Sequence, residues 1–350
     1  MAPTGPRQKV HALKGRPTSR SSSNEMKVGI SEAKQIASDA LQALGYPPTE
    51  ANTITEHLVD SEMRGYGSAG LARILSIADR LGGKKPAVGT QITREGPTSA
   101  QLDGKDTLGY LVALEATNLA IKKATEMGIA VIGANNTWYT GMLSFYAEIA
   151  TANDLVVLIA SNASPWVAPF GGYEPRFGTN PICIAFPSTS TPIIWDIGTS
   201  PMIHVQAVMA QRLGKDIGPN LAYNKNGEMT TNPQEALDGA FAVWGGHKGS
   251  GLAICVQLLG ALAGSPASPP NLAEFGFLVI AITPDLFRPV EEFKEQVDEY
   301  AKSLRSSKPL PGQSSLRMPF ERSADDRAKA LSRGYIEVDE AVVSRLKKFL

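Results

Sequence analysis

The chain has 350 residues, 43% of them hydrophobic and 19% charged, so it can bury a core and is not a disordered protein. Because single cores stop growing at roughly 250–300 residues, we expect two lobes or one core with appendages. Its 34 basic and 34 acidic residues balance, which argues against nucleic acid as the main partner. Two cysteines exclude a disulfide framework, and no apolar run reaches the roughly 18 residues of a membrane span. We expect a soluble, cytoplasmic protein without a membrane partner.

The first 25 residues differ in composition from the rest of the chain. Five basic residues precede the first acidic residue, Glu25, and Ser, Pro and Gly are frequent. A mitochondrial transit peptide has this charge pattern. However, Pro3, Pro6 and Pro17 oppose the helix that such a peptide forms. We therefore predict a disordered basic tail over residues 1–25, with mitochondrial targeting as the alternative.

From about Met26, helical and strand patterns alternate. Helical periodicity starts at Ser31, the predicted N-cap, and again at Thr49 after Pro47-Pro48. The later predicted elements are a helix at 111–127, a strand at 129–132, a helix at 142–152, strands at 155–160, 182–186 and 193–195, a helix near 202–212, a buried helix at 249–263, a buried strand at 275–282, and helices at 291–303, 324–332 and 339–349. This order predicts an α/β fold with a layered mixed sheet and helical N- and C-terminal parts.

One apparent cofactor motif does not fit its surroundings. Gly65-Tyr-Gly67-Ser-Ala-Gly70 matches G-x-G-x-x-G, the fingerprint of dinucleotide-binding Rossmann domains. That fingerprint works after a strand, with a helix starting at its last glycine. Here it follows a predicted helix, and no acidic residue closes a strand about 20 residues later. We reject the match and expect a fold other than the Rossmann fold.

Two polar segments and one aspartate carry features of a cofactor site. Residues 174–181 (EPRFGTNP) offer backbone and side-chain donors of the kind that hold phosphates or amides. Residues 245–251 (GGHKGSG) place a lysine at the start of the predicted buried helix, where anions bind favourably. Asp196 ends an apolar strand. Glycine-rich turns alone mostly serve geometry, but the combination favours a cofactor-binding enzyme.

With these segments, the chain resembles the malate/L-lactate dehydrogenase family of non-Rossmann oxidoreductases, which includes ureidoglycolate, sulfolactate and piperideine-carboxylate enzymes. The resemblance runs from Met26 to about Leu350 and is most specific at 166–181. It rests on HLVDSEMRG at 57–65, GLAR at 70–73, WVAPFGG at 166–172, EPRFGTNP at 174–181, DIGTS at 196–200 and GGHKG at 245–249. It implies an NAD- or NADP-dependent enzyme that moves hydride at a carbon beside a carboxylate. It also implies a homodimer with the active site at the subunit interface.

The resemblance further implies roles for single residues. The family pattern Asp-Ser-His-Gly-Val-x-Arg matches here at Ser68, as a catalytic residue, and at Arg73, as a bidentate clamp for the substrate carboxylate. Ala69 stands at the family's acid–base histidine and cannot transfer a proton. Tyr139 takes the place of a second family histidine and is a candidate catalytic residue, and Asp196 matches the relay carboxylate.

The cofactor segments match the family more closely. The predicted cofactor contacts are Gly178, Thr179, Asn180, Pro181, His247, Lys248 and Gly249. His57 is predicted to pack rather than to react. His204 replaces a family arginine, and contact with a cofactor phosphate is its less favoured role. No two histidines have the spacing of metal ligands, so we expect no metal site.

These features predict three parts and leave two functions open. The parts are the tail, a helical substrate and dimerisation lobe (26–110 with 290–350), and a cofactor-binding α/β lobe (111–289). In the first function the protein reduces a cyclic imine or a 2-oxo acid. Reducing a protonated imine needs no enzyme acid, whereas a ketone needs a proton donor, for which Tyr139 is a candidate. In the second, a catalytically impaired family member serves as a cofactor-binding or scaffold subunit. The retained cofactor segments favour the reductase.

Overall fold

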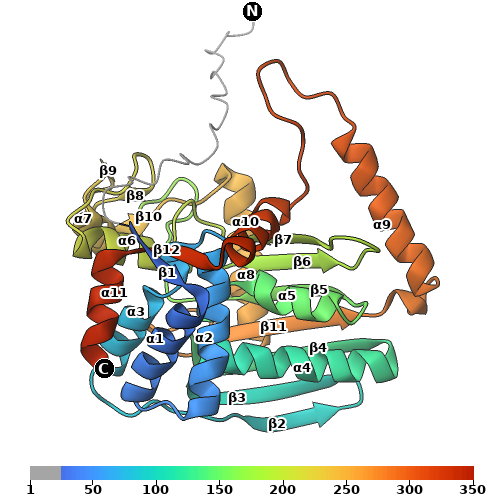
Figure 1. Cartoon of the computed structure of the whole chain (residues 1–350), viewed down its shortest axis with the longest axis horizontal. Helices are drawn as coiled ribbons and strands as arrows, with labels where there is room; N and C mark the ends of the chain where they lie inside the picture. Colours follow the sequence, from blue (N-terminus) through green and yellow to red (C-terminus); the bar gives the residue numbers. More distant parts are fainter. Residues whose placement is uncertain (1–24) are drawn as a thin grey trace, which may run out of the picture.

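The computed structural model describes residues 25–350, and the predicted tail lies outside this range except for Glu25, where the first strand begins. A seven-stranded sheet of order β2-β3-β4-β11-β5-β6-β7 forms the centre (Figure 1). Its strands are β2 (Gln91–Gly96), β3 (Ser99–Leu108), β4 (Ile129–Trp138), β11 (Phe275–Ile282), β5 (Val156–Ser161), β6 (Ile182–Phe186) and β7 (Ile193–Ile197). The β3–β4 pair is parallel and the other neighbouring pairs are antiparallel, which confirms the predicted mixed sheet.

Helices cover both faces of this sheet. In Figure 1, α4 (Gly109–Met127) and α5 (Leu143–Thr151) lie in front of it, and α8 (Gly246–Leu262) lies behind. Fully buried alanines such as Ala113, Ala116 and Ala120 let α4 approach the strands closely. The helix ends where Gly128 takes a left-handed φ of 86°, which confirms the predicted stop.

The two ends of the described chain meet beside the sheet. Strand β1 pairs antiparallel with β12, and the helices around this pair share one apolar core. The elements are β1 (Glu25–Gly29), α1 (Ile30–Ala43), α2 (Pro48–Met63), η1 (Gly67–Ala69), α3 (Arg73–Leu81), α10 (Glu321–Arg333), β12 (Tyr335–Asp339), α11 (Glu340–Leu346) and η3 (Lys347–Phe349). This confirms the helical N- and C-terminal parts.

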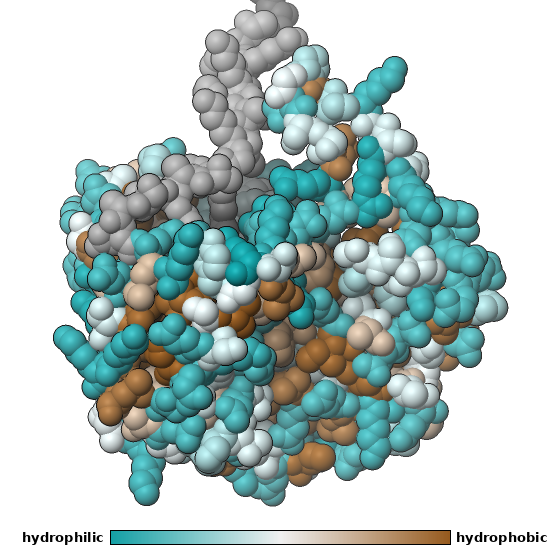
Figure 2. All heavy atoms as spheres, in the orientation of Figure 1, coloured by the Kyte–Doolittle hydropathy of each residue, from teal (hydrophilic) through white to brown (hydrophobic). Residues whose placement is uncertain are grey.

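The remaining elements form a small three-stranded sheet with short helices, and an outlying helix. They are α6 (His204–Arg212), β8 (Ala222–Tyr223), β9 (Met229–Thr230), α7 (Pro233–Asp238), β10 (Ala240–Phe241), η2 (Pro284–Leu286) and α9 (Val290–Arg305). Helix α9 runs along the edge of the molecule, far from α1 and α3 in Figure 1. On the face seen in Figure 2, hydrophilic side chains surround several apolar patches. No helix within residues 25–350 is long and apolar enough to cross a membrane.

The structure corrects two sequence-based expectations and confirms a third. The predicted N-cap at Ser31 is wrong, because β1 runs directly into α1 and Gly29 occupies the cap. Helix α8 was expected to be buried, yet its residues Ile254, Leu258 and Leu262 are 47%, 57% and 72% exposed. The glycine motif does follow α2, and only a three-residue helix, η1, starts within it. Its rejection as a dinucleotide fingerprint is confirmed.

Candidate active site

A buried arginine that has no counter-ion among the described residues marks the candidate active site. The guanidinium of Arg73, at the start of α3, lies 4.4 Å from the ring centroid of Tyr139. Arg73 is 8% exposed, and its Nε has no hydrogen-bond partner. Within residues 25–350 it forms no ion pair. Burying an unpaired cation is costly, so this arrangement suits an anionic ligand.

Two phenols lie beside this guanidinium. Burial raises the pKa of Tyr139, and the positive charge of Arg73 opposes the rise. Burial also raises the pKa of Tyr110, again against the positive charge of Arg73. Tyr110 belongs to α4, and no sequence motif marks it as a site residue. Both phenols are therefore protonated at neutral pH, and neither supplies a negative charge to Arg73.

The charge of Arg73 also acts on two buried histidines, His57 and His204, and both are neutral. Burial, followed by repulsion from Arg64 and Arg73, lowers the pKa of His57 to about 3. Its Nε2 accepts a hydrogen bond of 2.9 Å from the Met142 N–H, which confirms its packing role. Burial, followed by repulsion from Arg73, lowers the pKa of His204 to about 4. The His204 ring stacks on Trp166 at a centroid distance of 4.3 Å.

These lowered pKa values predict a loss of stability in acid. The unfolded chain takes up a proton on each histidine below pH about 6.5, whereas the folded chain resists until near pH 3 or 4. Stability should thus be full above pH 6.5 and fall by up to about 1.4 kcal/mol per pH unit for each histidine between pH 6 and 4. Urea unfolding measured at several pH values gives the unfolding free energy as a function of pH. Between pH 6 and 4, this free energy should fall less steeply for His57→Gln than for the parent. Equal slopes would contradict the assignment.

The loop that carries Tyr139 is fixed on several sides. Tyr139 itself has a left-handed φ of 50°. The carbonyl of Thr140 accepts a bond of 2.8 Å from the Tyr146 hydroxyl. At Gly141, with φ 76°, a Cβ would come within 2.4 Å of the Tyr110 ring, so only glycine fits. The phenol of Tyr139 is therefore held under Arg73 by a defined backbone.

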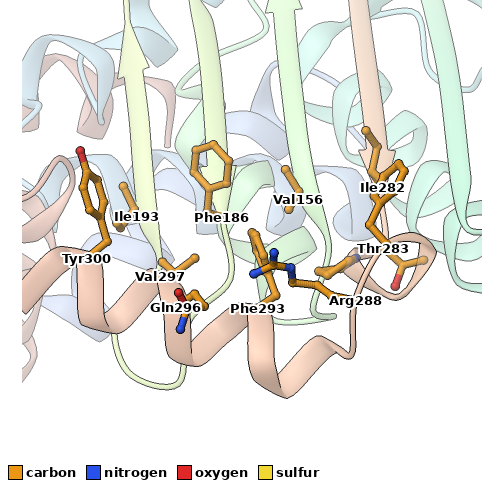
Figure 3. Close-up of a pocket in the computed structure, with 12 residues that line it drawn as sticks. Val156, Phe186, Ile193, Ile282, Thr283, Arg288, Phe293, Gln296, Val297 and Tyr300 are labelled. Atoms are coloured by element: carbon orange, nitrogen blue, oxygen red, sulfur yellow. The ribbon is translucent and has the colours of Figure 1, made fainter.

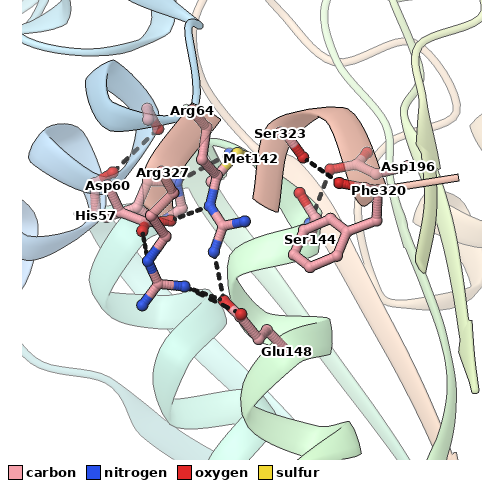
Figure 4. A network of polar contacts seen from close by, with 11 residues as sticks. His57, Asp60, Arg64, Met142, Ser144, Glu148, Asp196, Phe320, Ser323 and Arg327 are labelled. Carbon is pink, nitrogen blue, oxygen red and sulfur yellow. Dashed lines mark hydrogen bonds and ion pairs between the residues drawn. The ribbon is translucent and has the colours of Figure 1, made fainter. Parts of the chain in front are cut away.

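Asp196 supports the same region from β7. Its Oδ2 accepts a hydrogen bond of 2.7 Å from the Ser144 N–H at the start of α5 (Figure 4). Burial raises the pKa of Asp196, and hydrogen bonds from Ser144 and Leu143 oppose the rise. Asp196 thus caps α5, which begins four residues after Tyr139. Its relay role stays a prediction, as does the catalytic role of Ser68, which lies partly buried on η1.

The predicted cofactor segments come together on α8. Gln257 of α8 accepts hydrogen bonds on its Oε1 from the Gly178 N–H at 3.1 Å and from the Asn180 amide at 2.8 Å. The N–H of Thr199 donates a hydrogen bond of 2.9 Å to the Thr179 carbonyl. The Thr199 carbonyl in turn accepts one of 2.8 Å from the Trp244 N–H. Gln257 was visible in the sequence as a polar interruption of an apolar run, but its role needed the structure.

The first turn of α8 fits a phosphate group. Its N-cap residue is Gly245, which has no side chain to accept a hydrogen bond. The backbone N–H groups of the first turn therefore have no capping side chain. His247 and Lys248 are exposed there. At Gly249 a Cβ would come within 1.6 Å of the Trp244 carbonyl oxygen, so this close turn requires glycine. A helix N-terminus with an adjacent lysine attracts anions.

Other predicted residues face inward. The Asn180 amide nitrogen also donates to the Ala253 carbonyl at 2.8 Å, while its Oδ1 is buried without a partner. The carbonyl of Pro181 accepts from the Ser161 N–H at 3.1 Å. Both residues therefore hold the segment against the sheet and α8, and their contacts with a cofactor stay predictions. No cluster of His, Cys, Asp and Glu within residues 25–350 could hold a metal ion.

The chain thus combines a non-Rossmann α/β fold with a buried arginine and a glycine-rich helix start as its candidate binding features. The chain belongs to the malate/L-lactate dehydrogenase family, whose sequence profile matches residues 28–347. It is 33% identical to the L-sulfolactate dehydrogenase of Methanocaldococcus jannaschii over 90% of this chain and 94% of that protein. It is 29% identical to the Delta(1)-pyrroline-2-carboxylate reductase 1 of Burkholderia ambifaria over 93% and 98% of the two chains. A solved dehydrogenase from Sinorhizobium meliloti superposes with a TM-score of 0.86 at 28% identity, covering 93% of this chain and 98% of that one.

Proposed function

We propose that this protein is an NAD(P)-dependent oxidoreductase that moves hydride at a carbon beside a carboxylate, with a cyclic imino acid or a 2-oxo acid as its substrate. The observation that carries the proposal is the buried guanidinium of Arg73, which lies among neutral rings and has no ion-pair partner within residues 25–350. A substrate carboxylate would supply the missing counter-ion in a charge-assisted, bidentate contact. The names of the two relatives, a sulfolactate dehydrogenase and a pyrroline-carboxylate reductase, support both substrate classes.

The chain's own residues divide the work as follows. Lys248 and the first turn of α8 would hold a phosphate of the nicotinamide cofactor, which when bound supplies or accepts the hydride. Arg73 orients the carboxylate. Tyr139 keeps its proton at neutral pH, because burial raises its pKa, and could give it to a developing alkoxide. An iminium substrate needs no such donor, and Ala69 offers none, so the imine is the favoured substrate.

We also propose that the protein is a homodimer. The exposed residues Ile254, Leu258 and Leu262 repeat every four positions and form an apolar stripe along α8. Exposed apolar stripes of this kind mark contact surfaces. Because α8 also carries the phosphate subsite, a contact here would place a second copy close to it. Sedimentation of the purified protein as a monomer would contradict this assembly.

The cofactor assignment is tested by replacing Lys248. Lys248→Ala should weaken the binding of NADH or NADPH by about 1–3 kcal/mol, the range of a charge-assisted contact, without lowering stability. Fluorescence titration measures the affinity. Lys302→Ala, which removes an exposed lysine from α9, is the matched control and should have no effect. Equal affinities of Lys248→Ala and parent would overturn the phosphate site.

The proposed activity is tested with the same protein and reduced cofactor. A cyclic imine carboxylate and a set of 2-oxo acids are offered as substrates, and cofactor oxidation is followed by absorbance. Turnover of at least one of them is expected. Tight cofactor binding without any turnover would favour the alternative of a catalytically impaired subunit, for which Ala69 in place of the acid–base residue is the motivating observation.

A further inference from the structure

A cavity of about 700 Å³ lies between α9 and the ends of strands β11, β5, β6 and β7 (Figure 3). Its walls are largely apolar. Phe186 and Ile193 line it from β6 and β7, and Phe293 and Val297 face them from α9. Ligand pockets typically have volumes of roughly 300–1,000 Å³ and aromatic or aliphatic walls with a few polar groups. By size and lining, this cavity belongs to that class.

Polar contacts hold α9 in place on either side of the cavity. Lys294 forms an ion pair of 3.0 Å with Asp154. Asp298 accepts a hydrogen bond of 2.6 Å from the Ser190 hydroxyl and a further one from Thr189. Each of these α9 residues directly follows an apolar one that lines the cavity. The helix is therefore tied to the body by its polar positions, and the space under its apolar positions stays open.

The cavity has one charged residue in its wall, Arg288. In Figure 3 its side chain extends beside α9 toward Phe293. Within residues 25–350 this side chain makes no hydrogen bond or ion pair. The acidic residue Glu291, three positions on, pairs with Lys294 at 3.1 Å instead. Arg288 is exposed, so its charge lies at the mouth of the apolar cavity, an arrangement that complements an amphipathic anion whose charged end faces solvent.

We propose that this cavity is a second binding site, separate from that of Arg73, for a carboxylic acid with an apolar chain. The chain lies between the sheet residues and α9, and the carboxylate meets the guanidinium of Arg288. Ile193 lines the cavity and Asp196, on the same strand, caps α5. Strand β7 thus connects this cavity to the aspartate that caps α5, the helix that follows the Tyr139 loop.

The test uses the full chain with decanoate as the anionic probe and decanol as the uncharged one, both titrated by calorimetry. Arg288→Met should weaken decanoate binding by about two- to fivefold, as expected for an exposed charge pair, and leave decanol binding unchanged. Lys302→Met, which removes an exposed lysine of the same helix, should change neither. Val297→Asp, which places a carboxylate on the apolar wall, should remove the binding of both probes.

Further variants distinguish binding in this cavity from binding at the active site. Cofactor affinity confirms that each variant is folded, and Ile193→Asp places the carboxylate on the sheet side of the cavity if Val297→Asp does not fold. Decanoate binding that survives both wall variants would overturn the proposal. So would binding that is lost in Arg73→Met but kept in Arg288→Met, since the probe would then occupy the active site. Absence of decanoate binding to the parent, as when a second copy covers the cavity, would also overturn it.

Discussion

Replacing Arg73 by methionine is expected to lower activity at least about 100-fold without lowering the stability of the protein. Misplacing a substrate by about 1 Å can cost roughly 100-fold in rate, so losing the carboxylate clamp should lower kcat/KM by at least about that factor. At the same time, the variant removes a buried cation that has no ion-pair partner within residues 25–350. Replacing buried charge with apolar groups of similar volume is often neutral or stabilising. Steady-state kinetics and the thermal midpoint measure both effects.

Tyr139→Phe is the matched comparison for this variant. It keeps the ring under the guanidinium and removes only the hydroxyl. With an imine substrate, turnover should stay near that of the parent, while a ketone substrate should lose about 100-fold or more through the missing proton donor. Cofactor affinity should stay unchanged in both variants. If Arg73→Met instead lowers the unfolding free energy by several kcal/mol, the guanidinium is satisfied inside the protein and is no empty carboxylate clamp.

The sheet was predictable from the sequence where its strands are buried on both faces. Strands β5, β6 and β11 are near-continuous apolar runs, and their predicted bounds agree with the structure to within a residue or so. Strand β2 shows no apolar pattern in the sequence, because almost all of its residues are exposed and several are charged or polar. The pairing of β1 with β12 joins segments some 300 residues apart, beyond the reach of any local pattern.

The candidate site was predictable as residue types but not as a geometry. The family pattern pointed to Arg73 and Tyr139 separately, and nothing in their spacing shows that the guanidinium lies on the phenol ring. Tyr110 carries no motif and joins them because α4 starts next to the Tyr139 loop, where Gly109 packs on that backbone. The inward orientation of Asn180 likewise depends on Gln257, 77 positions away.

Disrupting a buried network of charged side chains is expected to cause the largest loss of stability. Arg64 is fully buried and donates hydrogen bonds to Asp60 at 2.6 Å and to Glu148 at 2.5 Å (Figure 4). Arg327 of α10 pairs with the same two carboxylates, at 3.1 Å and 2.9 Å. The network joins α2, α5 and α10, and α5 is the helix that Asp196 caps beside the Tyr139 loop. Its loss should therefore reach the candidate active site.

Arg64→Met should lower the unfolding free energy by about 3–5 kcal/mol, because it leaves the buried carboxylate of Asp60 short of a partner. Urea denaturation measures the change. Arg322→Met breaks an exposed pair with Asp326 on α10 and should cost less than about 1 kcal/mol. Adding Asp60→Asn to Arg64→Met should restore part of the loss by removing the stranded charge. A cost for Arg64→Met no larger than that of Arg322→Met would mean that Arg327 alone satisfies both carboxylates, and that α5 is held by its cap rather than by this network.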